Sequence, residues 1–206
     1  ASDVYKRQDV TGRGGHGARP QSAVDSVLVA SQIVVSAQSI VSRNVNPLQA
    51  AVVSFGAILS GDTQGSSVLP QTAKLVGTCR SFEPEVQDRV QERLCEVVEG
   101  VAQTYGAKAE CHYKRLYPAL LNHKEQAQAV KELVRDWLGE AGLMPAPQQM
   151  TAEDFAFMTQ VRPGCLFRLG IGDAEHRSNL HECEFDFNDE AIVYGSTLMV
   201  LIAQSR

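Results

Sequence analysis

The sequence has no continuous apolar run near the roughly 20 residues of a membrane span, and residues 1–20 lack the apolar core of a secretory signal peptide. It also lacks an excess of basic residues. The 19 Lys and Arg against 24 Asp and Glu give a net charge of −5, which disfavours nucleic acid as a partner. The five cysteines form no C-x-x-C pair, so neither a zinc knuckle nor a disulfide framework is indicated. These absences predict a cytoplasmic protein with reduced thiols that binds neither membrane nor nucleic acid.

Length and composition set broad limits on the fold. A chain of 206 residues suits one large or two small domains, and 44% hydrophobic with 21% charged residues is ordinary for a soluble globular protein. Residues 1–8 look foreign to the rest of the chain, because they show no apolar periodicity and fit no expected element. The stretch from Asp3 to Gln8 is also the translation of a transposon end (GATGTGTATAAGAGACAG) used in shotgun libraries. We therefore expect a library scar that makes this chain a fragment, with a natural polar tail as the alternative.

Hydrophobic periodicity predicts six elements between Asp9 and Tyr117. They are a strand ending at residues 9–11, a helix over 23–41 capped by Ser22, strands over 50–58 and 72–82, a helix from Pro84, and a strand over 107–117. The second helix should bury the stripe Val86, Val90, Leu94, Val97 and Val101. This β-α-β-β-α-β order predicts a ferredoxin-like domain, in which helices cover one face of a four-stranded antiparallel sheet.

Pro118 and Asn122 mark a boundary, beyond which strands and helices alternate. The pattern predicts a helix over 125–141, a short strand and helix around 150–158, a strand over 164–169, and a last helix over 189–204 capped by Asn188. Such alternation is typical of a parallel α/β layer. Three helices and two short strands make a thin core, so we expect residues 119–206 to be the end of a larger domain.

A glycine-rich loop from Gly12 to Pro20 holds a single imidazole, His16. Glycine lets the backbone turn sharply and approach a ligand closely. An imidazole can donate a hydrogen bond, accept one or bind a metal near neutral pH. The alternative interpretation is a tight turn with an incidental surface histidine.

In its order of motifs, the chain resembles the M20 metallopeptidase family, in the amidohydrolase branch that includes N-acyl-amino-acid, hippurate and auxin-conjugate hydrolases. The resemblance spans about residues 9–206. The motifs that carry it are the loop 12–20, the helix start 20–25, the strand 50–56, the runs 68–70 and 77–80, Glu153-Asp154-Phe155, Asn179-Leu180-His181 and Phe185-Asp186-Phe187. It implies that residues 9–118 are a dimerisation domain and that residues 119–206 end a metal-dependent catalytic domain of α/β class.

The resemblance implies a metal centre with His181 as a ligand, holding two divalent ions such as Zn, Mn or Co. The family's other ligands lie in a Cys-Gly-His-Asp stretch and a Glu-Glu pair, and neither motif occurs in this sequence. One histidine cannot hold a metal by itself, and the interpretation of His181 taken alone is that of a structural residue. We therefore expect this chain by itself to bind metal weakly and to be inactive.

The resemblance also implies roles in substrate recognition. His16 would donate a hydrogen bond to the developing oxyanion in the partner subunit's active site, and Arg80 would bind the substrate's free carboxylate. Ser67 stands where the family usually has asparagine, so it offers one hydroxyl in place of an amide. Glu153 and Asp154 either line the edge of the pocket or complement the start of a helix.

The leading hypothesis is a homodimeric amidohydrolase, assembled through residues 9–118, that cleaves N-acyl amino acids or similar small amides. A first alternative is a stand-alone ferredoxin-like dimerisation or binding module, which needs no metal. A second is another M20 branch, such as a dipeptidase, a carboxypeptidase or a desuccinylase.

Overall fold

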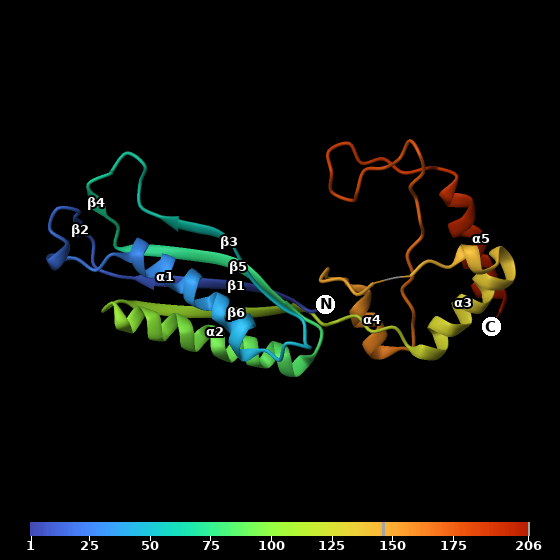
Figure 1. Ribbon diagram of the computed structural model, residues 1–206, viewed down its shortest axis with the longest axis horizontal. Helices are drawn as coiled ribbons and strands as arrows, with labels where there is room; N and C mark the ends of the chain where they lie inside the picture. The colour runs from blue at the N-terminus through green and yellow to red at the C-terminus, as the bar shows by residue number, and fades with distance from the viewer. Residues whose placement is uncertain (146, 206) are drawn as a thin grey trace. The chain divides into compact units, whose positions relative to one another are not determined.

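The computed structural model describes residues 1–145 and 147–205, and the chain divides into two compact units (Figure 1). The first unit contains residues 1–120 and 149–157, and the second contains residues 121–148 and 158 onward. The segment 149–157 joins the first unit in part through the amino terminus, where the Ala1 amine donates to the Thr151 carbonyl at 2.9 Å. The sequence predicts a single domain boundary at residue 118, with this segment in the second domain.

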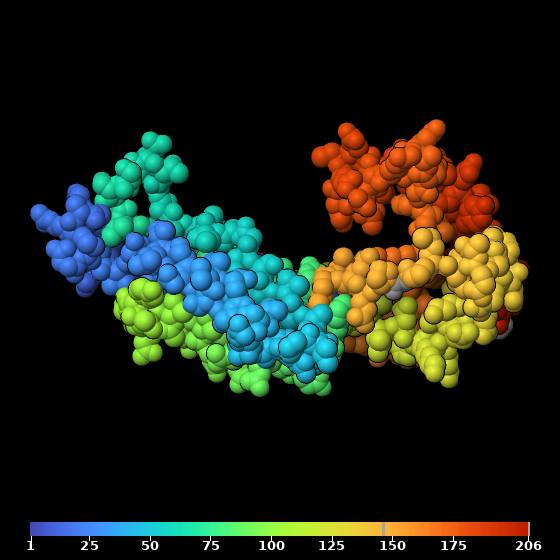
Figure 2. All heavy atoms as spheres, in the orientation of Figure 1, coloured from blue at the N-terminus to red at the C-terminus, as the bar shows by residue number. Residues whose placement is uncertain are grey.

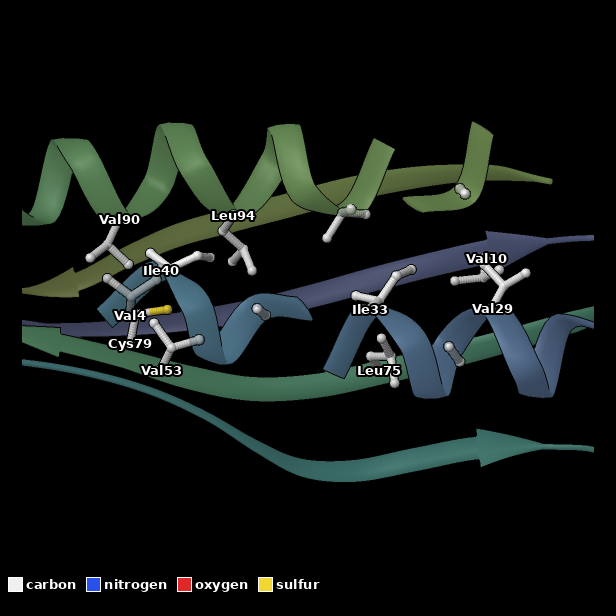
Figure 3. Close-up of a cluster of buried hydrophobic side chains, with 14 of the residues drawn as sticks. Val4, Val10, Val29, Ile33, Ile40, Val53, Leu75, Cys79, Val90 and Leu94 are labelled. Carbon is white, nitrogen blue, oxygen red and sulfur yellow. The ribbon is translucent and has the colours of Figure 1, made fainter. Parts of the chain in front are cut away.

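A four-stranded antiparallel sheet forms the first unit, in the order β3-β5-β1-β6. The strands are β1 (Asp3–Thr11), β3 (Ala51–Ser60), β5 (Thr72–Ser81) and β6 (Lys108–Tyr117). Helices α1 (Ser26–Ser39) and α2 (Pro84–Thr104) pack over one face and share a single core with the inward side chains of the strands (Figure 3). These six elements follow one another in the order that the periodicity predicts.

Residues 3–8 belong to the sheet, so the prediction that the stretch 1–8 fits no element is wrong. Strand β1 begins at Asp3 and pairs with both β5 and β6, and its inward positions Val4, Lys6, Gln8 and Val10 are buried. Long polar side chains at two of these inward positions conceal the alternation that marks a half-buried strand.

Lys6 is the most unusual residue of this strand. Its side chain is fully buried, and the ammonium nitrogen has no hydrogen-bond partner among the described residues. The nitrogen lies 2.9 Å from the centre of the Phe55 ring. Burial lowers the pKa of Lys6 to about 8, because the charged form loses its hydration.

Helix α1 starts later than the sequence suggests. Asp25 is its N-cap, and its carboxylate accepts hydrogen bonds from the Val27 and Leu28 amides at 2.9 and 3.1 Å. The predicted cap, Ser22, instead ends a short 3-10 turn, η1 (Pro20–Ser22). An aspartate directly before the first turn presents its oxygen to two free amides, which the more distant serine cannot reach.

The helix continues from α1 into a π-helical turn, η2 (Ile40–Asn44). By length and composition alone, the combined stretch Ser26–Asn44 is apolar enough to cross a membrane, which differs from the sequence expectation. Its buried residues, including Ile33 and Ile40, pack into the core of the first unit.

Helix α2 buries a regular stripe of Val86, Val90, Leu94, Val98 and Ala102. The predicted Val97 and Val101 are only partly buried and flank this stripe. The predicted stripe is displaced by one residue in its last two turns, which a helical period of 3.6 residues allows.

The second unit consists of helices and connecting segments. It contains α3 (Lys124–Leu138), the turn η3 (Glu140–Gly142) and α5 (Ala191–Gln204), while α4 (Phe155–Val161) crosses the division between units. Trp137 and Tyr194 join α3 to α5 with ring centres 5.8 Å apart. Helix α5 has Glu190 as its N-cap, and the predicted cap Asn188 instead accepts the Glu190 amide.

Within the described residues of the second unit no strand forms, so the predicted strand over 164–169 and the parallel layer are wrong. The segment is held instead by Asn122, whose side chain bonds both the amide and the carbonyl of Leu166 at 2.9 and 2.8 Å. A strand needs a neighbouring strand for its backbone groups, and the described part of this unit supplies none.

Candidate functional site

The glycine-rich loop forms one side of a small two-stranded ribbon. Strand β2 (Gly15–His16) pairs antiparallel with β4 (Val68–Leu69), and the Gly17 amide donates to the Ser67 carbonyl at 2.8 Å. In Figure 2 the loop and the segment before β4 protrude together at one end of the first unit. The structure therefore brings two predicted site residues, His16 and Ser67, side by side.

Glycines let the loop pack closely against the segments on both sides of it. A Cβ atom on Gly12 would lie 2.3 Å from the Val24 carbonyl oxygen, which is far inside van der Waals contact. A Cβ atom on Gly17 would lie 3.3 Å from the Ser67 oxygen, so the ribbon would have to open slightly. The sequence GRGGHG thus serves backbone packing as well as access to His16.

His16 is exposed, and one of its ring nitrogens is already used. The Nδ1 atom accepts a hydrogen bond from the Ala18 amide at 3.1 Å. An acceptor at Nδ1 places the proton of the neutral imidazole on Nε2. His16 therefore presents an N–H donor to solvent, which is the form that a hydrogen bond to a carbonyl oxygen requires.

Arg80 lies near the end of β5, with its guanidinium held by two acceptors. One terminal nitrogen donates to the Met150 carbonyl at 3.0 Å, and the other lies 3.2 Å from the Asp3 carboxylate. The Thr78 hydroxyl donates to the same carboxylate at 2.9 Å. The Arg80 side chain is 24% exposed, so the guanidinium is oriented and largely shielded from solvent at this end of the sheet.

His16 and Arg80 do not meet within one chain. The ribbon lies beside the first residue of β5, Thr72, and Arg80 follows eight residues later along a straight strand (Figure 1). At about 3.3 Å per residue, the strand alone separates the two ends by roughly 26 Å. A small substrate cannot contact both residues of the same chain.

The acidic pair lies on the Arg80 side of the first unit. Glu153 and Asp154 follow closely on Met150, whose carbonyl Arg80 contacts. Glu153 accepts the Phe155 amide at 3.4 Å, and Asp154 is exposed. The pair precedes α4, so both predicted interpretations, helix start and site edge, fit its position.

His181 lies in an exposed turn of the second unit. It has a positive φ of 73°, which non-glycine residues rarely adopt outside tight turns. Glu182 closes the turn by accepting the amide and side-chain nitrogens of Asn179 at 2.9 and 2.8 Å. These bonds lower the pKa of Glu182.

A second histidine nearby is held by a carboxylate. His176 Nδ1 lies 2.9 Å from Asp173, which also accepts two backbone amides, and these contacts lower the pKa of Asp173 to about 2. The hydrogen bond to Asp173 raises the pKa of His176. No pattern in the sequence indicates this pair.

The described residues do not form a complete metal site. No group of three histidine, cysteine or acidic side chains in residues 1–145 and 147–205 is placed to hold an ion. Protein zinc sites use three or four such ligands, so His181 could supply only one of those required.

Asp3, the partner of Arg80, was not predicted as a site residue, because it lies in the stretch 1–8 that shows no apolar periodicity. The available signal was an aspartate three residues before the buried Lys6, on the opposite face of the strand.

Comparison with known proteins identifies relatives along nearly the whole chain. The model of peptidase family M20/M25/M40 matches residues 12–205. A protein named Probable hydrolase sll0100, from Synechocystis sp., is 35% identical over 189 residues, which are 90% of this chain and 48% of that protein. The N-acetyldiaminopimelate deacetylase of Bacillus pumilus is 36% identical over 184 residues, which are 89% of this chain and 47% of the enzyme.

A solved structure also resembles the mixed α/β fold. The YXEP protein of Bacillus subtilis, described as a dinuclear metal binding peptidase from the M20 family, matches with a TM-score of 0.74 at 25% identity. The match covers 98% of this chain and 49% of that one, and the chain spans about half the length of the curated relatives that it matches. The chain belongs to peptidase family M20/M25/M40.

Proposed function

We propose that this chain is part of a cytoplasmic, metal-dependent amidohydrolase that cleaves N-acyl amino acids or similar small amides. The observation that carries the proposal is the His16 ribbon, where glycines expose an imidazole with its donor nitrogen free. The relatedness to an N-acetyldiaminopimelate deacetylase supports the same class of substrate.

Three side chains would recognise the substrate. The Nε2–H of His16 would donate to the amide oxygen as negative charge develops on it. The Ser67 hydroxyl, directly before strand β4 of the ribbon, would add one weaker donor. Arg80 would bind the free carboxylate, with Glu153 and Asp154 at the edge of its pocket.

The separation of these residues supports a homodimer. His16 lies on the ribbon beside the start of β5 and Arg80 lies near the end of β5, so a single substrate can reach both only if each comes from a different subunit. We assign the contact between subunits to residues 9–118, interpreted as a ferredoxin-like dimerisation domain. A symmetric dimer would then hold two identical sites.

Residues 119–206 would be the last part of a larger catalytic domain. Helix α5 is apolar on nearly all sides, yet Ile192, Val193, Met199 and Val200 are more than half exposed in the chain. A helix that is hydrophobic all round is normally buried. The other ligands of a two-ion site that includes His181 would come from the part of the catalytic domain that this sequence does not contain. We therefore expect the chain alone to bind metal weakly and to be inactive.

We retain the proposal that residues 1–8 are not native. The buried ammonium of Lys6, which lacks a hydrogen-bond partner among the described residues, supports it, because such a group is costly at a position that suits an apolar side chain. The sequence upstream of Asp9 in the intact gene tests this origin directly.

A stand-alone dimerisation module is the second candidate. The lack of a three-ligand group among residues 1–145 and 147–205 favours it. It predicts a stable metal-free dimer with no hydrolase activity in any longer form of the protein. Another M20 branch would differ only in the amide that it cleaves.

The test is hydrolysis by the complete protein, purified with added Mn²⁺ or Zn²⁺ and assayed on hippurate, N-acetyl amino acids and dipeptides. The proposal expects release of the free amino acid from the acylated substrates, and loss of metal-dependent turnover in His181→Ala. Cleavage of dipeptides alone would point to another branch. No cleavage of any amide by a folded, metal-loaded protein would favour the module.

A further inference from the structure

Helix α2 and strand β6 carry a pair of neighbouring thiols that the proposed hydrolase does not use. Cys95 lies on α2 and Cys111 on β6, and both are partly exposed. Cys95 follows Gln91 by one turn on α2, and Cys111 precedes Arg115 by four residues on β6, so the bonds between Arg115 and Gln91 bring the two thiols to matching positions on adjacent elements. The pair therefore combines proximity with access to small reagents.

The two elements are held together on both sides of the thiols. Arg115 of β6 donates to Asp88 at 2.6 Å and to Gln91 at 2.6 and 3.0 Å, one or two turns before Cys95 on α2. At the other end, the Ala107 amide donates to the Ala102 carbonyl at 2.9 Å. These contacts keep the helix and strand in register, so the thiols stay close.

The two thiols are electrostatically unequal. A hydrogen bond from Cys111 lowers the pKa of Cys95, because it stabilises the thiolate. The same bond and burial raise the pKa of Cys111, which therefore keeps its proton as the donor. Cys95 is thus the better nucleophile of the pair.

The three other cysteines of the chain are poorer disulfide partners for Cys95 and Cys111. Cys79 is buried on β5, two strands away from β6, and burial raises its pKa to about 11. Two strand spacings amount to roughly 9.6 Å, beyond the reach of a disulfide. Cys165 and Cys183 belong to the second unit.

We propose that Cys95 and Cys111 form a peroxide-sensitive dithiol that closes to an intramolecular disulfide. The Cys95 thiolate attacks one oxygen of hydrogen peroxide, giving a sulfenic acid and releasing hydroxide, which takes up a proton to become water. Cys111 loses its proton to solvent base and attacks the Cys95 sulfur, so that the S–S bond forms and a second hydroxide leaves as water. Peroxide is reduced to two waters while two thiols are oxidised.

The disulfide would link α2 covalently to the edge strand of the sheet. Residues 95–111 would become a closed loop, which restricts the unfolded chain and raises the stability of the first unit. Reduction by a thiol such as dithiothreitol would reverse the change.

The experiment treats this chain, with Cys165→Ser and Cys183→Ser as background, with equimolar hydrogen peroxide. Remaining thiols are then blocked with N-ethylmaleimide, and peptides are mapped without reduction. The expected result is a peptide joined at Cys95 and Cys111, the loss of two blocked thiols, and a higher urea midpoint that dithiothreitol lowers again.

Two matched variants assign the roles. Cys111→Ser should leave a sulfenic acid at Cys95 that dimedone traps, whereas Cys95→Ser should leave Cys111 as a free thiol. Circular dichroism verifies that both variants are folded. A disulfide through Cys79 would overturn the proposal. So would a Cys95 that still reacts with N-ethylmaleimide after peroxide treatment of the folded parent chain. No readout depends on hydrolysis.

Discussion

The Asp3 carboxylate lies 3.2 Å from the guanidinium of Arg80, so the arginine proposed to bind a substrate carboxylate already has an anionic partner in its own chain. The pair is largely shielded from solvent, with side chains 16% and 24% exposed. Because Thr78 also bonds Asp3, we expect Asp3→Asn to lower the free energy of unfolding by about 1–2 kcal/mol, measured with urea.

The more exposed pair Arg7–Asp9 on the same strand provides the control, since its side chains are 39% and 34% exposed. Asp9→Asn should change stability by less than about 1 kcal/mol. Equal losses in the two variants would show that Asp3 has no special role in holding Arg80.

Lys6→Met should stabilise the first unit, because it replaces a buried ammonium with an apolar side chain of similar length. The pKa of Lys6 is about 8 in the folded chain, against 10.5 for the free side chain. The unfolded chain therefore binds the proton more tightly, and the destabilisation is fully present below pH 8 and disappears as the pH rises toward 10.5.

At pH 7 the substitution should add about 2–3 kcal/mol to the free energy of unfolding. The advantage should be much smaller at pH 10, with urea denaturation as the measurement at both values. A gain that is the same at both pH values would contradict the assignment to Lys6 protonation.

Gly12→Ala should disturb the base of the His16 loop, since the new Cβ would lie 2.3 Å from the Val24 oxygen. We expect a loss of about 1–3 kcal/mol, as for other overpacked positions. Gly100→Ala is the control, because this helical glycine has no atom within 4 Å of an added Cβ and should gain up to about 1 kcal/mol. A neutral Gly12→Ala would show that the loop shifts freely.

The core of the first unit should respond sharply to truncation. Leu94 is fully buried between α2 and the sheet (Figure 3), and Leu94→Ala should cost about 3 kcal/mol. Leu48, which is 95% exposed, should tolerate alanine within about 0.5 kcal/mol. Thermal or urea unfolding of both variants tests whether the core is centred where the structure places it.

The sequence patterns predicted the elements that alternate or repeat cleanly and missed those that do not. The apolar stripe from Val86 to Leu94 and the strands around Val53 and Leu75 were readable, because each has one buried face. Strand β1 was not, since Lys6 and Gln8 occupy inward positions. The strand predicted over 164–169 was wrong because a strand depends on neighbours that periodicity does not reveal.

The residues of the candidate site were also predictable from the sequence only in part. A glycine loop around His16 is a local signal, but its pairing with Ser67 joins residues far apart in the chain and follows only from the fold. The opposite placement of His16 and Arg80 likewise depends on the length of β5. Long-range geometry of this kind has no counterpart in spacing along the sequence.

The central claim is that His16 and Arg80 act on one substrate from two subunits, and subunit mixing tests it most directly. Complete protein carrying His16→Ala is mixed with complete protein carrying Arg80→Ala, each inactive alone, under conditions that exchange subunits. Heterodimers would hold one intact site, so activity should return to roughly a quarter of the wild-type value. Activity that stays at the level of the separate variants, although heterodimers form, would contradict the account.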